Sequence, residues 1–163
     1  MSLVVADTTP VNYLVLCEAI DVLRPLYGQV VLPSAVFQEL NHDRTPPRVR
    51  AWVNALPEWV AVKTPALSAP NANLGRGERE AIALAHELKA VELLIDERLA
   101  REIAIQSGLA VTGTIGVLEA AAAHNLLELP ATLELLRQTN FRFEKGLFEA
   151  ALVRDAGRKP QQR

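Results

Sequence analysis

The sequence has one cysteine in 163 residues, so it cannot form an internal disulfide or a cysteine-based zinc cluster. It also lacks an excess of positive charge, because 17 Lys and Arg stand against 19 Asp and Glu and give a formal net charge of −2. This balance argues against a protein that coats nucleic acid through bulk charge, while a small local site on nucleic acid stays open. The longest uncharged run, residues 103–118, is interrupted by glycines and polar residues and is too short for a span of about 20 apolar residues.

The start of the chain has no feature of a targeting signal. No Lys or Arg precedes Arg24, and Asp7 stands where a signal peptide needs an apolar residue. We therefore expect a cytoplasmic protein without a membrane segment. Half of the residues are hydrophobic and 22% are charged, which is a globular composition. The length suits a single domain, predicted at residues 1–157, followed by a frayed polar tail at residues 158–163.

Short apolar runs alternate with helix-forming segments along most of the chain. The runs predict strands at residues 3–6, 29–32, 93–95 and 109–111. Helices are predicted from Pro10, with Thr9 as the N-cap residue, and at residues 19–27, 34–40, 78–88, 97–107, 114–124, 132–138 and 145–156. Residues 41–77 hold prolines 46, 47, 57, 65 and 70, and we interpret them as an irregular elaboration with one short helix around Trp52. The alternation predicts an α/β fold with helices on both faces of a mainly parallel sheet of four or five strands.

Acidic residues occur where an open parallel sheet binds ligands, at the carboxyl ends of its strands. Asp7 ends the first predicted strand, and Asp96 follows the strand at residues 93–95. Each aspartate alone is better explained as a turn or cap residue than as a functional one. Glu39 lies late in a helix, where a negative charge opposes the helix dipole, whereas Glu78 opens the next helix, where the dipole favours an acid. Four acids at one sheet edge would repel one another unless a cation were bound.

These four candidate ligands offer only carboxylate oxygens. Such a set suits Mg²⁺ or Mn²⁺ rather than zinc, and the three histidines have no partner at metal-ligand spacing. Ions of this kind activate water in phosphoryl transfer, which favours a nuclease or a phosphatase. The phosphatase is the weaker alternative, because Thr9 stands where a second aspartate would be needed.

Five segments resemble the PIN-domain family, the fold of the VapC-type toxin ribonucleases. They are Asp7-Thr8-Thr9-Pro10 and residues 32–40, 74–85, 94–98 and 111–118. The resemblance implies a three-layer α/β/α sandwich and an endoribonuclease that hydrolyses RNA with Mg²⁺ or Mn²⁺. It implies that the catalytic and metal-binding residues are Asp7, Glu39, Glu78 and Asp96, with Thr8 or Thr9 orienting a carboxylate or water. Family members often form homodimers and are commonly neutralised by a small antitoxin protein.

Two of the predicted site positions have alternatives. Glu80 could replace Glu78 as the third ligand, although residues two apart in a helix face about 200° apart, so only one of them points squarely at a given spot. Glu97 is a weaker alternative to Asp96. The predicted function is an RNA-cleaving toxin of a toxin–antitoxin pair, and the alternative is a PIN-like binding or regulatory module without catalysis.

Overall fold

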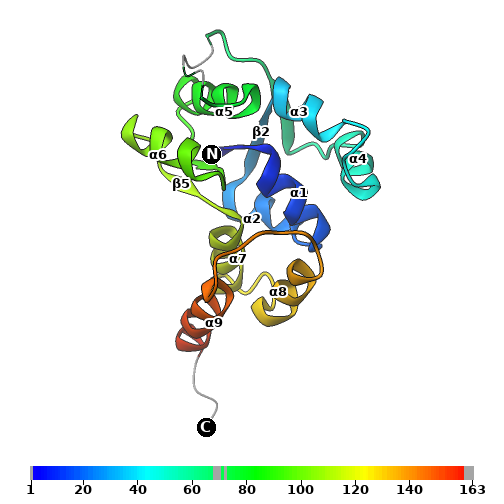
Figure 1. The fold of residues 1–163 in the computed structure, drawn as a ribbon, viewed down its shortest axis with the longest axis vertical. Coiled ribbons are helices and arrows are strands. Elements are labelled where there is room, and N and C mark those ends of the chain that lie inside the picture. The colour runs from blue at the N-terminus through cyan, green and yellow to red at the C-terminus, as the bar shows by residue number, and fades with distance from the viewer. Residues whose placement is uncertain (1, 68–70, 72, 160–163) are drawn as a thin grey trace.

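A computed structural model describes residues 2–67, 71 and 73–159, and Figure 1 shows its fold. One parallel sheet has the strand order β3-β2-β1-β4-β5. Its strands are β1 (Leu3–Ala6), β2 (Gln29–Pro33), β3 (Val60–Lys63), β4 (Glu92–Leu94) and β5 (Val111–Thr112). The predicted parallel sheet is therefore confirmed, with five strands. β5 begins at Val111, where the predicted strand ends.

The strand β3 lies inside the stretch that the sequence predicts to be irregular. It pairs in parallel with β2, from Val30 opposite Val60 to Pro33 opposite Lys63. Only Val60 of this edge strand is buried, so the segment lacks the continuous apolar run by which a buried strand is predicted. The helix predicted in the same stretch is present as α4 (Pro47–Val53).

Helices cover both faces of the sheet. They are α1 (Thr8–Leu16), α2 (Leu23–Tyr27), α3 (Ser34–Leu40), α5 (Arg76–Glu87), α6 (Arg98–Gln106), α7 (Thr114–Ala123), α8 (Leu129–Arg137) and α9 (Leu147–Arg158), with a 3₁₀ turn at Ile20–Val22. In Figure 1, α5 and α6 lie to one side of the sheet, and α1, α7 and α8 lie to the other. The helix α1 begins at Thr8 and not at Pro10, because Asp7 takes the extended N-cap conformation predicted for Thr9.

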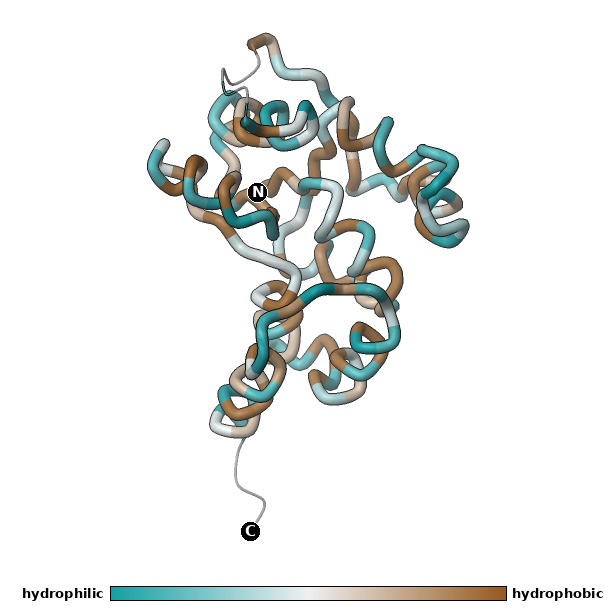
Figure 2. The backbone as a smooth tube through the Cα atoms, viewed as in Figure 1, coloured by the Kyte–Doolittle hydropathy of each residue, from teal (hydrophilic) through white to brown (hydrophobic). Residues whose placement is uncertain are grey.

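Two hydrophobic cores separate the layers. Successive residues of a strand point to opposite faces of the sheet. Val4 and Ala6 accordingly belong to the larger core, with residues of α1, α7, α8 and α9, whereas Val5 belongs to the smaller core beneath α5 and α6. The hydrophobic colours of Figure 2 follow the central strands and the inner faces of the helices. The three-layer α/β/α sandwich is thus confirmed.

The C-terminal helices close the larger core. α8 begins at Leu129, earlier than predicted, and Phe148 of α9 is fully buried. α9 continues to Arg158, one residue past the predicted end of the domain, and Lys159 pairs with Asp155 at 3.1 Å. Residues 160–163 of the predicted tail lie outside the described residues. Within the described ranges, no helix is long and apolar enough to cross a membrane.

The order of the strands fixes where a ligand can bind. The chain adds β2 and β3 on one side of β1, and β4 and β5 on the other, so the winding reverses between β1 and β4. Open α/β sheets bind ligands beyond the carboxyl ends of the strands at such a reversal. Asp7 follows β1 directly and its N–H donates to the carbonyl of Leu94 at 2.9 Å, while Asp96 lies two residues beyond β4. Both strand-end aspartates therefore lie at the reversal point.

Candidate metal centre

Asp7 is a buried carboxylate surrounded by further acids. Only 4% of the residue is exposed. Burial raises the pKa of Asp7 from 3.8 to about 7; the negative charges of Glu78, Glu39 and Asp96 also raise it, and the N–H of Thr8 lowers it. All three other predicted site residues thus act on the charge of Asp7. Among the described residues, no positively charged side chain offsets this rise in the pKa of Asp7.

Glu39 reaches from the last turn of α3 to the start of α1. The hydroxyl of Thr8 donates a hydrogen bond to its carboxylate. Gly77 of α5 approaches from the other side so closely that a Cβ atom at this glycine would lie 2.6 Å from Oε1 of Glu39. The space left by the missing side chain of Gly77 is therefore occupied by the Glu39 carboxylate.

Glu78 lies in the first turn of α5. Its Oε2 accepts a hydrogen bond from the backbone N–H of Gly75 at 3.1 Å. Burial raises the pKa of Glu78, the bond from Gly75 lowers it, and the charges of Glu97 and Glu39 raise it further. Glu78 therefore shares its electrostatic environment with Glu39 and Asp7.

The two glutamates considered as alternatives cap helices instead. Oε1 of Glu80 accepts hydrogen bonds from the hydroxyl of Ser34 at 2.8 Å and from the N–H of Ala35 at 3.0 Å, at the start of α3. Burial opposes ionisation of Glu80, but these hydrogen bonds lower its pKa. Glu97 precedes α6 and accepts a hydrogen bond from the N–H of Ala100 at 2.7 Å. Both side chains have structural partners that account for them.

Asp96 joins the end of β4 to the start of α7. Its Oδ1 accepts a hydrogen bond from the N–H of Thr114 at 2.8 Å, and its Oδ2 accepts one from the Thr114 hydroxyl at 2.5 Å. Burial raises the pKa of Asp96, while Thr114 and the charge of Arg101 lower it. A Cβ atom at Gly113 would lie 2.6 Å from Oδ1, so this glycine leaves room for the carboxylate.

The oxygen donors of the four predicted site residues fit a hard divalent cation. Across the described part of the chain, no group of three or more His, Cys, Asp or Glu side chains is arranged to hold a metal ion directly. The donors are nevertheless all carboxylates, and within the described ranges no positive side chain is among the groups that act on the charge of the buried Asp7. Mg²⁺ commonly keeps several waters and takes only one or two protein carboxylates. Mg²⁺ or Mn²⁺ bound partly through water therefore suits this set of residues.

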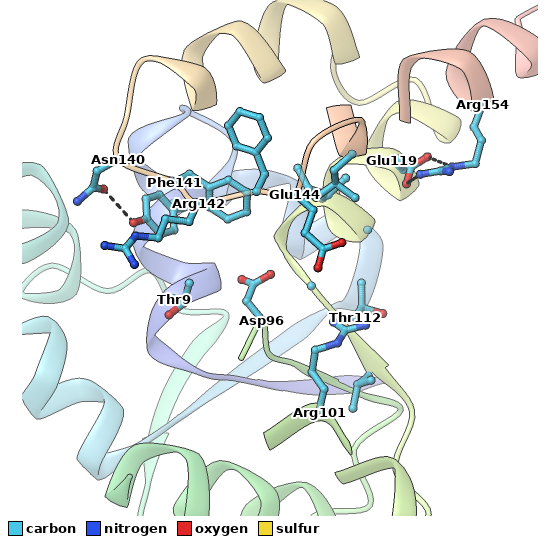
Figure 3. A pocket seen from close by; sticks show the side chains of 17 residues that line it. Thr9, Asp96, Arg101, Thr112, Glu119, Asn140, Phe141, Arg142, Glu144 and Arg154 are labelled. Carbon is cyan, nitrogen blue, oxygen red and sulfur yellow. Dashed lines mark hydrogen bonds and ion pairs between the residues drawn. The ribbon is translucent and has the colours of Figure 1, made fainter. Parts of the chain in front are cut away.

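A cavity of about 760 Å³ adjoins the acids, and Asp96 is the member of the predicted set that lines it (Figure 3). One wall comes from β5 and the start of α7, and the opposite wall comes from the segment between α8 and α9. The side chains of Arg101 and Arg142 lie around the cavity in Figure 3. This cavity extends the candidate site from Asp96 toward the C-terminal segment.

The sequence prediction did not include Arg101 or the cavity residues between α8 and α9. A usable signal was present at Phe141-Arg142-Phe143, where aromatic and basic residues alternate as they do on surfaces that bind single-stranded nucleic acid. Arg101 carries no such signal, because its place beside Asp96 depends on the packing of α6.

Comparisons with known proteins agree with this fold. A family model described as a PIN domain matches residues 3–156. A solved PilT N-terminus domain protein from the hyperthermophilic archaeon Sulfolobus solfataricus P2 is similar with 18% sequence identity and a TM-score of 0.50, over 87% of this chain and 97% of that chain. At this identity the likeness shows the fold alone. No curated protein matches the sequence.

Proposed function

The chain belongs to the PIN-domain family, generally a nuclease fold, and on this premise we propose that it is a metal-dependent endoribonuclease. The observation that carries the proposal is the burial of Asp7 at the reversal point of the sheet, where the charges of three other acids act on it. Four carboxylates so placed repel one another in the absence of a cation. A divalent ion bound among these carboxylates would relieve their repulsion, so the site is suited to binding one.

The proposed metal-binding and catalytic residues are the four acids Asp7, Glu39, Glu78 and Asp96, which would hold the ion partly through bound waters. Mg²⁺ or Mn²⁺, when bound, supplies an activated water and offsets charge at the scissile phosphate. The chain holds the acids in place: Thr8 fixes Glu39, and Thr114 fixes Asp96 through two hydrogen bonds. These contacts orient carboxylate oxygens before the substrate arrives, which reduces the reorganisation needed during the reaction.

A toxin role extends this proposal. It rests on the resemblance to the VapC-type toxin ribonucleases, and its partners are cytoplasmic RNA, a small antitoxin protein and a second copy of the chain. Light scattering of the purified protein checks the homodimer. Co-expression with the protein encoded by an adjacent reading frame checks the antitoxin, which must reduce RNA cleavage when bound.

Cleavage of a mixed RNA pool with Mg²⁺ or Mn²⁺ tests the proposed function. Wild type is compared with Asp7→Asn and with the matched control Asp21→Asn, whose side chain is exposed on the 3₁₀ turn. We expect Asp7→Asn to lower the cleavage rate on the order of 100-fold or more, because the loss of one carboxylate weakens metal-assisted catalysis by several kcal/mol. Equal cleavage by wild type and Asp7→Asn contradicts the proposal. Absence of cleavage by wild type favours the non-catalytic PIN-like module.

A further inference from the structure

The cavity beside Asp96 has a wall that suits an unpaired nucleotide. We propose that residues 138–146, the α8–α9 segment, bind single-stranded RNA, with one base stacked on Phe143 and one phosphate held by Arg142. The inference rests on the proposed function, since it takes RNA as the substrate.

The position of the cavity connects it to the candidate metal centre. In Figure 3, Asp96 lies near the centre of the labelled side chains, with Asn140 and Arg142 on one side of it and Thr112 and Arg101 on the other. Its volume of about 760 Å³ lies within the range of pockets that enclose a small organic ligand. In Figure 2, the α8–α9 segment has mostly hydrophilic colours. A strand of RNA can therefore extend from the acids along this segment.

Phe143 forms an aromatic platform at the cavity wall. The residue is 37% exposed, yet its ring is held by the fully buried Phe148, with ring centroids 4.0 Å apart and an interplanar angle of 18°. The ring of Phe141 is nearly parallel to it, at 16° and 6.4 Å. The guanidinium of Arg137 lies 5.9 Å from the centroid of Phe143 and 5.1 Å from that of Phe148, and it steadies both rings. Phe143 lines the cavity, so the exposed part of its ring is available to a base, and single-strand binding proteins use aromatic residues in this way.

Arg142 is the cation best placed for a phosphate. Arg142 lines the cavity together with Tyr13 and Asn140. The Tyr13 hydroxyl donates to Oδ1 of Asn140 at 2.9 Å and holds the segment against α1. Arg142 is exposed and, among the described residues, forms no ion pair with an acid.

The other charged side chains of the cavity are less available. Arg154 is bound to Glu119 through two hydrogen bonds, at 2.7 Å and 3.0 Å. Arg101 uses Nη1 to bind the carbonyl of Ile95 at 2.9 Å. Glu144 also faces the cavity in Figure 3, and its charge weakens phosphate binding. Stacking on the aromatic platform therefore carries more of the binding than charge does.

The platform selects for an unpaired strand. The bases of a duplex stack on one another and are paired, so they cannot reach an aromatic ring in the wall of a cavity. An unpaired base has a free face for the ring. RNA in loops and single-stranded regions is therefore the expected substrate.

Fluorescence anisotropy with a short, unstructured, fluorescein-labelled RNA tests the inference. The assay contains EDTA, so that binding is measured without cleavage. We expect Phe143→Leu to weaken binding about tenfold or more, and Phe143→Trp to retain it, because tryptophan preserves the aromatic face. We expect Arg142→Gln to weaken RNA binding. We also expect it to reduce the slope of log affinity against log salt concentration by about one, which corresponds to the loss of one phosphate contact. Ile105→Ala, at a position 55% exposed on α6, and Arg98→Gln serve as matched controls without effect.

Two results overturn the inference: unchanged binding by Phe143→Leu, or equal affinity for the single strand and for a duplex of the same sequence. Thermal unfolding shows whether Phe143→Leu is misfolded. If it is, binding by Phe143→Trp and Arg142→Gln tests the inference instead. Unchanged RNA binding by Arg142→Gln also overturns the inference. The outcome is separable from the proposed function. If wild type cleaves RNA but Phe143→Leu binds it as tightly as wild type does, only the aromatic platform is rejected. If Phe143→Leu weakens binding but wild type does not cleave RNA, only the endoribonuclease is rejected.

Discussion

The Glu80 carboxylate accepts a hydrogen bond from the Ser34 hydroxyl at 2.8 Å, which ties the start of α5 to the start of α3. The Nε of Arg76 donates to the second carboxylate oxygen of Glu80 at 3.1 Å. α3 is the helix that carries Glu39, so this contact supports the candidate site without belonging to it. Glu78, two residues earlier, acts instead on the charge of Asp7. Two glutamates in one helical turn thus have separate roles.

Substitution of the two glutamates should separate stability from activity. We expect Glu80→Ala to lower the free energy of unfolding by about 2 kcal/mol, because it leaves the Ala35 N–H and the Ser34 hydroxyl at the start of α3 without their acceptor. Glu78→Ala should change stability by less than about 1 kcal/mol and should abolish RNA cleavage. Urea unfolding measures the stability of both variants, and an RNA cleavage assay measures their activity. Full cleavage by Glu78→Ala, or a stable Glu80→Ala without cleavage, contradicts this assignment.

Gly77→Ala should reduce cleavage while the protein stays folded. The added methyl group would lie 2.6 Å from Oε1 of Glu39, so the flexible carboxylate must move away from its present position. Alanine favours a helix over glycine by about 1 kcal/mol, which compensates for the displacement in stability. The matched control is Gly157→Ala in α9, where a Cβ atom meets nothing within 4 Å. Melting temperature and cleavage rate are measured together, and wild-type cleavage by Gly77→Ala counts against a role for Glu39.

The stability of the metal-free protein should depend on pH through Asp7. Its folded-state pKa of about 7 lies above the ordinary value of 3.8, so the folded protein binds the proton more tightly than the unfolded chain does. The contribution of Asp7 to stability therefore rises as the pH falls from about 7 toward 4, and is least favourable above pH 7. At about pH 8, Asp7→Asn should be more stable than wild type, by up to about 4 kcal/mol.

Urea unfolding in EDTA at several pH values checks this expectation. The difference between Asp7→Asn and wild type should shrink toward about pH 4, where the wild-type carboxyl is protonated in the folded state. Asp21→Asn, an exposed position, should follow wild type throughout. If the free energies of unfolding of Asp7→Asn and wild type change with pH in parallel, the pKa of Asp7 is not raised in the folded protein.

Much of the fold follows from local sequence patterns. β1 and β2 are continuous apolar runs that end at a turn or helix start, and such runs predict buried strands. β3 shows no such run, since its pairing with β2 satisfies the backbone while most of its side chains stay exposed. The strand-end rule also locates Asp7 and Asp96, because the sheet reverses between the two strands that precede them.

The finer structure of the site depends on packing that the sequence does not encode locally. Helical periodicity separates Glu78 from Glu80 but does not say which of them faces the acids. That choice depends on the contact of α5 with α3, through Ser34. The cavity likewise joins Arg101 and Arg142, which are far apart in the sequence, because the burial of Phe148 anchors the α8–α9 segment.

Direct measurement of Mn²⁺ binding is the sharpest test of the candidate metal centre. Electron paramagnetic resonance follows the loss of the free Mn²⁺ signal as wild type, Asp7→Asn or Asp21→Asn is added. Wild type and Asp21→Asn should bind the ion alike, and Asp7→Asn should bind it about tenfold or more weakly, because it loses a charged oxygen ligand. Free Mn²⁺ in the presence of excess wild type, or equal binding by Asp7→Asn, would contradict a metal centre built on Asp7.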